Sequence, residues 1–301
     1  MVMDNPADER KLDEILDRLD TIDVAAAGGI LKEIKQVLDE AGVTFFLRQG
    51  TCLGAIRDGA LIPWDDDIDV GSVIGLNGFD EAAVEPIVRT FAARGFLTRI
   101  ERKDHYLYVP LVKSGVRADW CSYWVIDDSV FMYPGIRIPI RFLTDLEEIE
   151  FLGERFHVPN PPEEYLRVKY GEEWRTPKRA GDYESDIIDR IPDTSAPGRT
   201  GGLKQFLVRN LLRGRAARFL VLDEGGNACG DARVRIAGLG HAVTDRQGIA
   251  RLYVPRADHY ALIFTIGGHD DIRYVERVVP GETLVYRPNE ELRPATDEER
   301  R

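Results

Sequence analysis

Apolar side chains recur every three or four residues in the first part of the chain, which is the spacing of one buried helix face. The first stripe consists of Leu12, Ile15, Leu16 and Leu19, and the second of Ile30, Ile34, Val37, Leu38 and Ala41. Gly28-Gly29 separates the two stripes, and Gly42 follows the second as a stop signal. The pattern predicts helix over residues 8–41, interrupted at Gly28-Gly29, and we assign it to the scaffold.

Residues 44–171 mix short strand-like runs with helical stripes. The strand-like runs are 44–47, Phe96–Ile100, Tyr106–Val112, Val116–Val125, Ile136–Phe142, Ile149–Leu152 and Phe156–Val158. Helical spacing favours helices over Phe79–Arg94 and Glu163–Tyr170, closed by Gly95 and Gly171. The charged run Asp145–Glu150 is typical of a solvated face or a helix start.

The hydrophobic pattern changes between Phe219 and Pro288. There, short runs of alternating apolar and polar residues recur at intervals of about ten residues between Gly, Asp and Asn turns. These runs are Phe219–Leu222, Ala232–Ile236, Ala250–Val254, Tyr260–Thr265 and Arg273–Val279. The spacing predicts a small antiparallel β-sandwich. The acidic tail Asn289–Arg301 is expected to be disordered.

A Gly- and Pro-rich linker over residues 176–202 joins the two regions. It leads into a basic segment, between Asp193 and Asp223, that holds six arginines or lysines and no acid. Leu203, Phe206, Leu207 and Leu211 add a helical apolar stripe to it. Such a basic amphipathic helix binds an anionic membrane surface or docks onto its own domain, and both alternatives stay open.

Composition excludes several classes of protein. The 301 residues suffice for two domains, and the net charge of −12 argues against a nucleic-acid partner. No apolar run approaches the length needed to span a bilayer. Cys52, Cys121 and Cys229 lie far apart, and the first residues lack the features of a secretory signal. We therefore expect a cytoplasmic protein, with peripheral contact at the inner membrane face as the membrane alternative.

An acidic cluster carries the first chemical signal. In a strand, Asp65, Asp67 and Asp69 would share one face, while Ile68 and Val70 would point to the core. Carboxylates this close repel one another and raise each other's pKa, which a hard divalent cation relieves. The pattern predicts a Mg²⁺ or Mn²⁺ site, with a solvated acidic turn as the alternative.

A Gly-Thr turn precedes these acids at short range. Gly50 and Thr51 follow the apolar run and open the segment Cys52–Arg57, which can form helical turns. Backbone N–H groups and a hydroxyl at a helix start suit a phosphate, and Arg57 suits its oxygens. The combination of a phosphate cradle and metal carboxylates predicts chemistry on a phosphate ester or anhydride.

Three further charged residues extend the candidate site. Asp119 lies inside an apolar strand, where a lone carboxylate needs a partner. That partner is either a cation from Arg99, Lys113 or Arg117, or a metal ion shared with the first acids. Lys169 and Arg175 lie near the last helix and serve either solubility or phosphate binding.

The run from Arg48 to Val70 resembles the signature of the LicD family, which includes phosphocholine transferases and fukutin-type ribitol-phosphate transferases. The resemblance is carried by Arg48-Gln-Gly-Thr51, Leu53-Gly-Ala-Ile-Arg57 and Ile62-Pro-Trp-Asp-Asp-Asp-Ile-Asp-Val70. A second stretch, Tyr165 to Pro177, is similar to a later element of the same family. The resemblance implies an α+β fold, with a nucleotidyltransferase-like mixed sheet and flanking helices over residues 28–180.

It also implies an activity. The donor would be a CDP-activated small alcohol, such as CDP-choline, CDP-ribitol or CDP-glycerol, and the acceptor a hydroxyl of a cell-surface glycan or its lipid-linked precursor. Asp67 and Asp69 would hold the metal ion, and Asp119 would complete the site and help to deprotonate the acceptor. Gly50, Thr51, Arg57, Lys169 and Arg175 would contact phosphates, and Asp65 would position the strand or a second metal.

The C-terminal frame, from Val221 to Leu262, resembles carboxypeptidase-regulatory-like (transthyretin-like) modules, which implies an accessory role. The expected domains are a helix at 1–27, the catalytic domain at 28–180, a linker with the basic helix at 181–217, the sandwich at 218–288 and the tail at 289–301. Two rival functions stay open: a nucleotidyltransferase that attaches NMP from an NTP to a small molecule, and a non-catalytic glycan-binding module.

Overall fold

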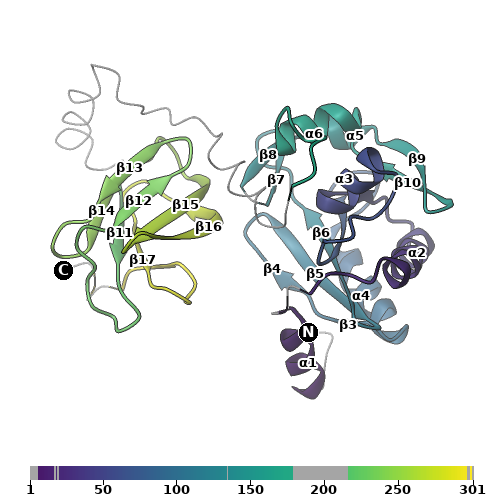
Figure 1. The fold of residues 1–301 in the computed structure, drawn as a ribbon, viewed down its shortest axis with the longest axis horizontal. Helices are drawn as coiled ribbons and strands as arrows, with labels where there is room; N and C mark the ends of the chain where they lie inside the picture. The colour runs from purple at the N-terminus through teal and green to yellow at the C-terminus, as the bar shows by residue number, and fades with distance from the viewer. Residues whose placement is uncertain are drawn as a thin grey trace. The chain divides into compact units, whose positions relative to one another are not determined.

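The computed structural model describes residues 6–16, 18, 20–133, 135–178, 216–296 and 299, apart from the side chains of residues 274 and 275. Residues 179–215, which hold most of the basic segment and of the linker expected at 181–217, lie outside these ranges. The chain divides into two compact units (Figure 1). The first is Met1–Phe131 with Arg137–Tyr183, and the second is Met132–Ile136 with Glu184–Arg301.

Two helices begin the first unit: α1 (Pro6–Leu16) and α2 (Val24–Glu40). The predicted interruption at Gly28-Gly29 is wrong, because both glycines lie inside α2. The break falls before Asp23, whose carboxylate accepts hydrogen bonds from the amides of Ala25 and Ala26 and so caps α2. A good N-cap thus decides where the helix starts, and the weak helix propensity of two glycines does not end it.

A six-stranded mixed sheet forms the centre of the first unit. Its order is β1 (Phe46–Leu47), β2 (Ile68–Val73), β6 (Val116–Tyr123), β5 (Tyr106–Lys113) and β3 (Leu97–Thr98), with β4 (Glu101–Arg102) also paired to β5. β2 and β6 are parallel, and the other pairs are antiparallel. Ser114-Gly115 makes the tight turn between β5 and β6, as predicted, with both residues at positive φ.

Helices flank this sheet, which confirms the predicted α+β class (Figure 1). They are α3 (Gln49–Arg57), a 3₁₀ turn at Glu81–Ala83, α4 (Val84–Ala93), α5 (Arg141–Thr144) and α6 (Pro162–Tyr170). Helix α2 contacts α4 and β6, whereas α3 contacts β2 and α6. Trp120 of β6 is fully buried against Phe79 and Phe91, which ties α4 to the middle of the sheet.

Two local predictions in this unit need correction. The strand expected at Ile136–Phe142 is β8 (Ile136–Pro139), which pairs with β7 (Ser129–Met132) and is followed by α5. The charged run Asp145–Glu150 lies largely in strand β9 (Glu147–Phe151), which pairs with β10 (Glu154–Val158). The helix start is therefore wrong, whereas the alternative of a solvated face is confirmed, because Glu147, Glu148 and Glu150 are exposed.

The second unit consists of two four-stranded sheets. One has the order β14 (Ile249–Tyr253), β11 (Ala216–Val221), β17 (Thr283–Tyr286) and β18 (Arg293–Pro294). The other has β13 (Gly240–Val243), β12 (Arg233–Ile236), β15 (Asp258–Ile266) and β16 (His269–Val278). Side chains from both sheets share one core, in which the rings of Phe264 and Tyr286 stack at 3.9 Å. The unit is a β-sandwich, although β11 and β17 are parallel where an antiparallel arrangement was predicted.

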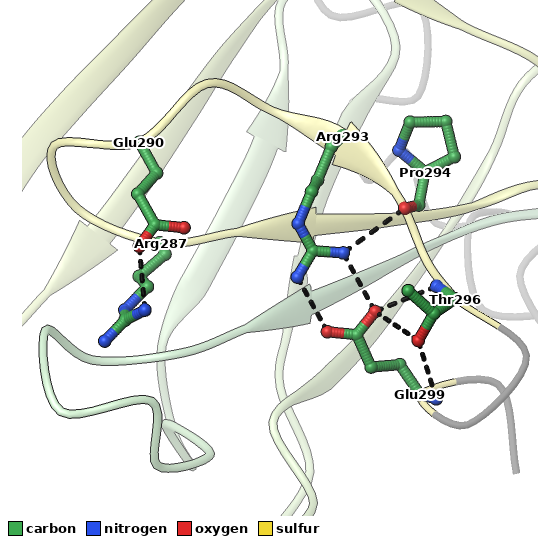
Figure 2. A network of polar contacts seen from close by, with 6 residues as sticks. All are labelled: Arg287, Glu290, Arg293, Pro294, Thr296 and Glu299. Atoms are coloured by element: carbon green, nitrogen blue, oxygen red, sulfur yellow. Dashed lines mark hydrogen bonds and ion pairs between the residues drawn. The ribbon is translucent and has the colours of Figure 1, made fainter.

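The tail is more ordered than expected. Strand β18 pairs with β17, and the Ala295 amide donates to the Thr283 carbonyl oxygen at 2.8 Å. Arg293 forms a two-point ion pair with Glu299, whose carboxylate also accepts from Thr296 (Figure 2). These backbone bonds and the burial of Ala295 outweigh the acidic composition on which the prediction of disorder rested.

Among the residues that the structure describes, no helix is long and apolar enough to span a membrane.

Candidate functional site

Parallel pairing of β2 with β6 brings the predicted carboxylates together. The register places Asp69 directly beside Asp119, and Asp67 immediately precedes β2. One carboxylate oxygen from each of Asp67, Asp69 and Asp119 lies within 4.8 Å of the others. Ile68 and Val70 are fully buried on the opposite face, as the alternation predicted. We call these three acids the carboxylate cluster.

Asp65 is placed differently from the prediction. Strand β2 begins at Ile68, so Asp65 and Asp66 lie in the preceding loop and do not extend the strand face. Asp65, Asp66 and Asp67 nevertheless form a second group of acids close enough to share an ion. Asp67 belongs to both groups and connects them.

Arg48 is the fixed counter-ion of the cluster. It follows β1, its amide donates to the Asp69 carbonyl oxygen, and its guanidinium lies 2.6 Å from Asp69 Oδ1. The Nε of Arg48 also donates to the Val70 carbonyl oxygen at 3.2 Å, and only 4% of the residue is exposed. This buried, multiply bonded ion pair fixes the orientation of Asp69.

Arg117 is the second cation at the cluster. Its guanidinium lies 3.2 Å from Asp119, 3.6 Å from Asp67 and 3.7 Å from Asp66. Tyr108 donates its hydroxyl to the other oxygen of Asp119 at 2.9 Å. Asp119 therefore has the salt-bridge partner that one alternative required and also lies among the acids that the other required.

Burial and mutual repulsion shift the acidity of two cluster members. Burial raises the pKa of Asp67 well above its usual value, and the charges of Asp69 and Asp119 raise it further. Burial raises the pKa of Asp69 to about 6, against the opposing effect of Arg48. The cluster is therefore short of positive charge despite its two arginines.

The donor set fits a hard divalent cation. Three carboxylates offer oxygen ligands from neighbouring backbone positions, and oxygen is the ligand that Mg²⁺ and Mn²⁺ prefer. A cation there would also relieve the repulsion that raises the pKa of Asp67. The identity of the ion stays a prediction.

The Gly-Thr turn is built into the scaffold of the cluster. A Cβ on Gly50 would lie 2.0 Å from an oxygen of Asp65, so glycine lets that carboxylate approach the start of α3. Thr51 is buried, and its hydroxyl accepts a hydrogen bond from the Asp69 amide at 2.8 Å. Both residues thus position acids, and their contact with phosphate stays a prediction.

The three remaining predicted residues are placed as follows. Arg57 ends α3 and pairs with Asp58 at 2.6 Å. Lys169 is buried, and its charge lowers the pKa of Asp69, so the solubility reading of this lysine is wrong. Arg175 is more than half exposed, pairs with Glu163 at 2.6 Å and packs on the ring of Trp174. Neither contact connects Arg175 with the cluster.

Sequence reasoning missed the role of Arg48, and it named Arg117 only as one of three cations that could pair with Asp119. Arg117 lies two residues before Asp119, on the same face of a strand, which was a usable signal. Arg48 pairs with Asp69 only because β1 and β2 are antiparallel neighbours, with Leu47 opposite Val70. That register cannot be read from spacing along the chain.

Comparisons with known proteins agree with the resemblance seen in the sequence. Residues 42–161 match the family model described as LicD/FKTN/FKRP, nucleotidyltransferase domain. The ribitol 5-phosphate transferase FKRP of Mus musculus is 29% identical over 150 residues, which are 45% of this chain and 29% of FKRP. The ribitol-5-phosphate transferase FKTN of Mus musculus is 25% identical over 183 residues, which are 55% of this chain and 37% of FKTN. The chain therefore spans well under half the length of these curated relatives.

A solved structure, ANT(2″)-Ia in complex with adenylyl-2″-tobramycin, is 18% identical and covers 44% of this chain and 68% of its own. The TM-score of this match is 0.31. The strand order described above defines the fold class. The carboxylate cluster lies wholly inside the matched region. Residues 42–161 are thus similar to the LicD/FKTN/FKRP nucleotidyltransferase domain, as the family match and the named relatives both indicate.

Proposed function

We propose that this protein is a metal-dependent transferase that moves a phospho-alcohol group from a CDP-activated donor to a hydroxyl of a glycan or its lipid-linked precursor. The observation that carries the proposal is the side-by-side placement of Asp69 and Asp119 on parallel strands, with Asp67 completing the set. The matched relatives named as ribitol-5-phosphate transferases favour a polyol phosphate as the transferred group.

Each residue of the candidate site has a separate role in the proposed reaction. A divalent cation held by Asp67, Asp69 and Asp119 would neutralise charge that develops on the diphosphate during transfer. Arg48 holds Asp69 in place, and Tyr108 orients Asp119. Asp119 would take the proton of the acceptor hydroxyl, whose oxygen forms the new bond to phosphorus. The anhydride bond breaks at the same phosphorus, and CMP leaves with the electron pair.

The second unit has an accessory role in this proposal. Its two sheets and shared core fit the transthyretin-like resemblance of the sequence, and such a module would bind the acceptor or position the enzyme.

A thermal-shift panel tests the proposal. The ligands are CDP-ribitol, CDP-glycerol, CDP-choline, CTP and ATP, each with and without Mg²⁺, on the wild type and on Asp69→Asn. A ligand that binds the native state raises the apparent unfolding midpoint. At a ligand concentration a hundred times its Kd, the native state is stabilised by about 2.7 kcal/mol. We expect a Mg²⁺-dependent shift with one CDP-alcohol, absent in Asp69→Asn.

Other outcomes would redirect the assignment. A shift with triphosphates alone would favour transfer of NMP from an NTP, with pyrophosphate as the product. The absence of any shift with folded protein would contradict both enzymatic readings and favour a glycan-binding module.

A further inference from the structure

Arg48 and Arg117 serve the same acids but are held in very different ways. Arg48 is almost wholly buried and donates to a carbonyl oxygen as well as to Asp69. Arg117 makes one hydrogen bond among the described residues, to Asp119 at 3.2 Å. Its contacts with Asp66 and Asp67, at 3.7 and 3.6 Å, are too long for hydrogen bonds. Arg48 is therefore held by the backbone as well as by a carboxylate, whereas the contacts of the Arg117 guanidinium with described residues are with carboxylates.

Arg117 has more N–H hydrogen-bond donors than hydrogen bonds to described residues. A guanidinium carries five N–H donors in a planar fork that matches phosphate oxygens. The Nε of Arg117 is buried and has no hydrogen-bond partner among the residues that the structure describes. An unpaired buried donor costs free energy, so a site that keeps one is suited to a ligand that pairs with it. About a fifth of the Arg117 side chain is exposed, so the residue is not sealed off from solvent.

The position of Arg117 conflicts with a divalent cation. The guanidinium faces one oxygen of Asp67 and one of Asp119, and both residues belong to the cluster that would hold the ion. A guanidinium and a divalent cation repel each other at such distances, most of all in a partly buried site. When the carboxylates bind a cation, Arg117 therefore loses its attraction to them and needs another anion.

We propose that Arg117 binds the CDP-activated substrate. Its guanidinium neutralises the carboxylate cluster until the divalent cation binds and then pairs with the diphosphate of that substrate. This inference rests on the proposed function, because it takes the cluster as the metal site. It names the guanidinium that would contact the non-reacting phosphate oxygens, a role that Arg57 and Arg175 were expected to fill. Those two arginines already pair with Asp58 and Glu163.

Calorimetric titrations of the full chain with Mn²⁺ alone, and with CDP at saturating Mn²⁺, separate the two halves of this role. Arg117→Met removes the charge and keeps the length of the side chain. We expect it to bind Mn²⁺ about tenfold more tightly, because a repelling charge is gone, and CDP about tenfold more weakly, because a charged donor is lost. Arg155→Met is the matched control, since Arg155 is an exposed arginine of the same unit, paired with Glu148. It should change neither affinity.

Arg117→Gln guards against a folding defect, because glutamine still donates to Asp119 without a charge. It should shift both affinities in the same directions as Arg117→Met. Unchanged CDP affinity in folded Arg117→Met or Arg117→Gln, or weaker Mn²⁺ binding in both, would assign Arg117 a structural role and overturn the inference. Failure of the wild type to bind Mn²⁺ would instead overturn the proposed function, so the two failures are distinguishable.

Discussion

At the scale of single residues, charge balance explains the candidate site. The alternation of acids and apolar residues predicted that Asp67 and Asp69 share a face, and the family resemblance added Asp119 to them. Neither signal predicted that Arg48 pairs with Asp69, because that pairing depends on the register of β1 and β2, whereas Arg117 was one of the cations expected beside Asp119. The same acids explain why Thr51 is buried: its hydroxyl accepts the Asp69 amide and fixes the start of β2.

The raised pKa of Asp69 predicts a pH dependence of stability without metal. Its carboxyl has a pKa of about 6 in the folded chain and an ordinary, lower pKa in the unfolded chain. The folded state therefore binds more protons between about pH 4 and pH 6, and its contribution to stability falls as the pH rises through that window. A divalent cation binds the ionised form, so the rise in Tm caused by Mg²⁺ should be clearly larger at pH 7.5 than at pH 5.

Thermal melts at the two pH values, with and without Mg²⁺, measure this difference. Asp69→Asn removes one titrating ligand and should reduce the Mg²⁺ effect at both pH values, whereas Asp67, whose pKa is also raised, still titrates in this variant. An equal Mg²⁺ effect at both pH values in the wild type would contradict the assignment of Asp69 as a ligand.

At the scale of elements, the sequence predicted types better than boundaries. Helix α6 and the β5–β6 hairpin agree with their predicted ranges because Pro161-Pro162, Gly171 and Ser114-Gly115 are strong local signals. The helix break at Gly28-Gly29 was wrong, since the signal at Asp23 is a hydrogen-bonded cap and glycine is only a weak breaker. The parallel register of β2 and β6 depends on packing between segments far apart in the chain, so no local pattern contains it.

Two glycine substitutions test this element-scale account. Gly29→Ala adds a Cβ with nothing within 4 Å inside α2, so it should stabilise the protein by roughly 0.5–1 kcal/mol. Gly54→Ala in α3 would place a Cβ 2.5 Å from the backbone oxygen of Ala60, which cannot move aside like a side chain. We expect it to destabilise by about 1–3 kcal/mol, as overpacking does.

Urea unfolding at equilibrium measures both changes, and the two variants serve as controls for each other. If Gly29→Ala is destabilised, the backbone at Gly29 needs a conformation that alanine disfavours, as the predicted helix break would require. An unchanged Gly54→Ala would show that the close approach of α3 to the Ala60 loop is relaxed in solution.

At the scale of the whole molecule, the chain combines a unit that carries the acids with a β-sandwich that has its own core. The sequence predicted both from the change in pattern near residue 219. It did not predict the parallel pairing of β11 with β17 or the inclusion of the tail in that sheet, because both depend on long-range backbone bonds. The Arg293–Glu299 pair in Figure 2 is exposed and contributes little by itself.

Separate cores predict separate responses to mutation and metal. Phe264→Ala removes a fully buried ring that stacks on Tyr286 and should destabilise the second unit by about 3–5 kcal/mol. Mg²⁺ should raise the unfolding temperature of the first unit, which holds the acids. Differential scanning calorimetry should therefore show two transitions, one lowered by Phe264→Ala and the other raised by Mg²⁺. A single transition that both treatments move would contradict this independence.

The most direct measurement of the central claim is a calorimetric titration of Mn²⁺ into the wild type and into Asp119→Asn, with folding checked by circular dichroism. The account predicts a saturable site in the wild type and a loss of affinity of about a hundredfold in Asp119→Asn, because a carboxylate ligand becomes a neutral amide. Asp258→Asn in the second unit should bind like the wild type. Wild-type affinity in Asp119→Asn would show that the parallel strands do not form one metal site, and the proposed transferase chemistry would then lose its basis.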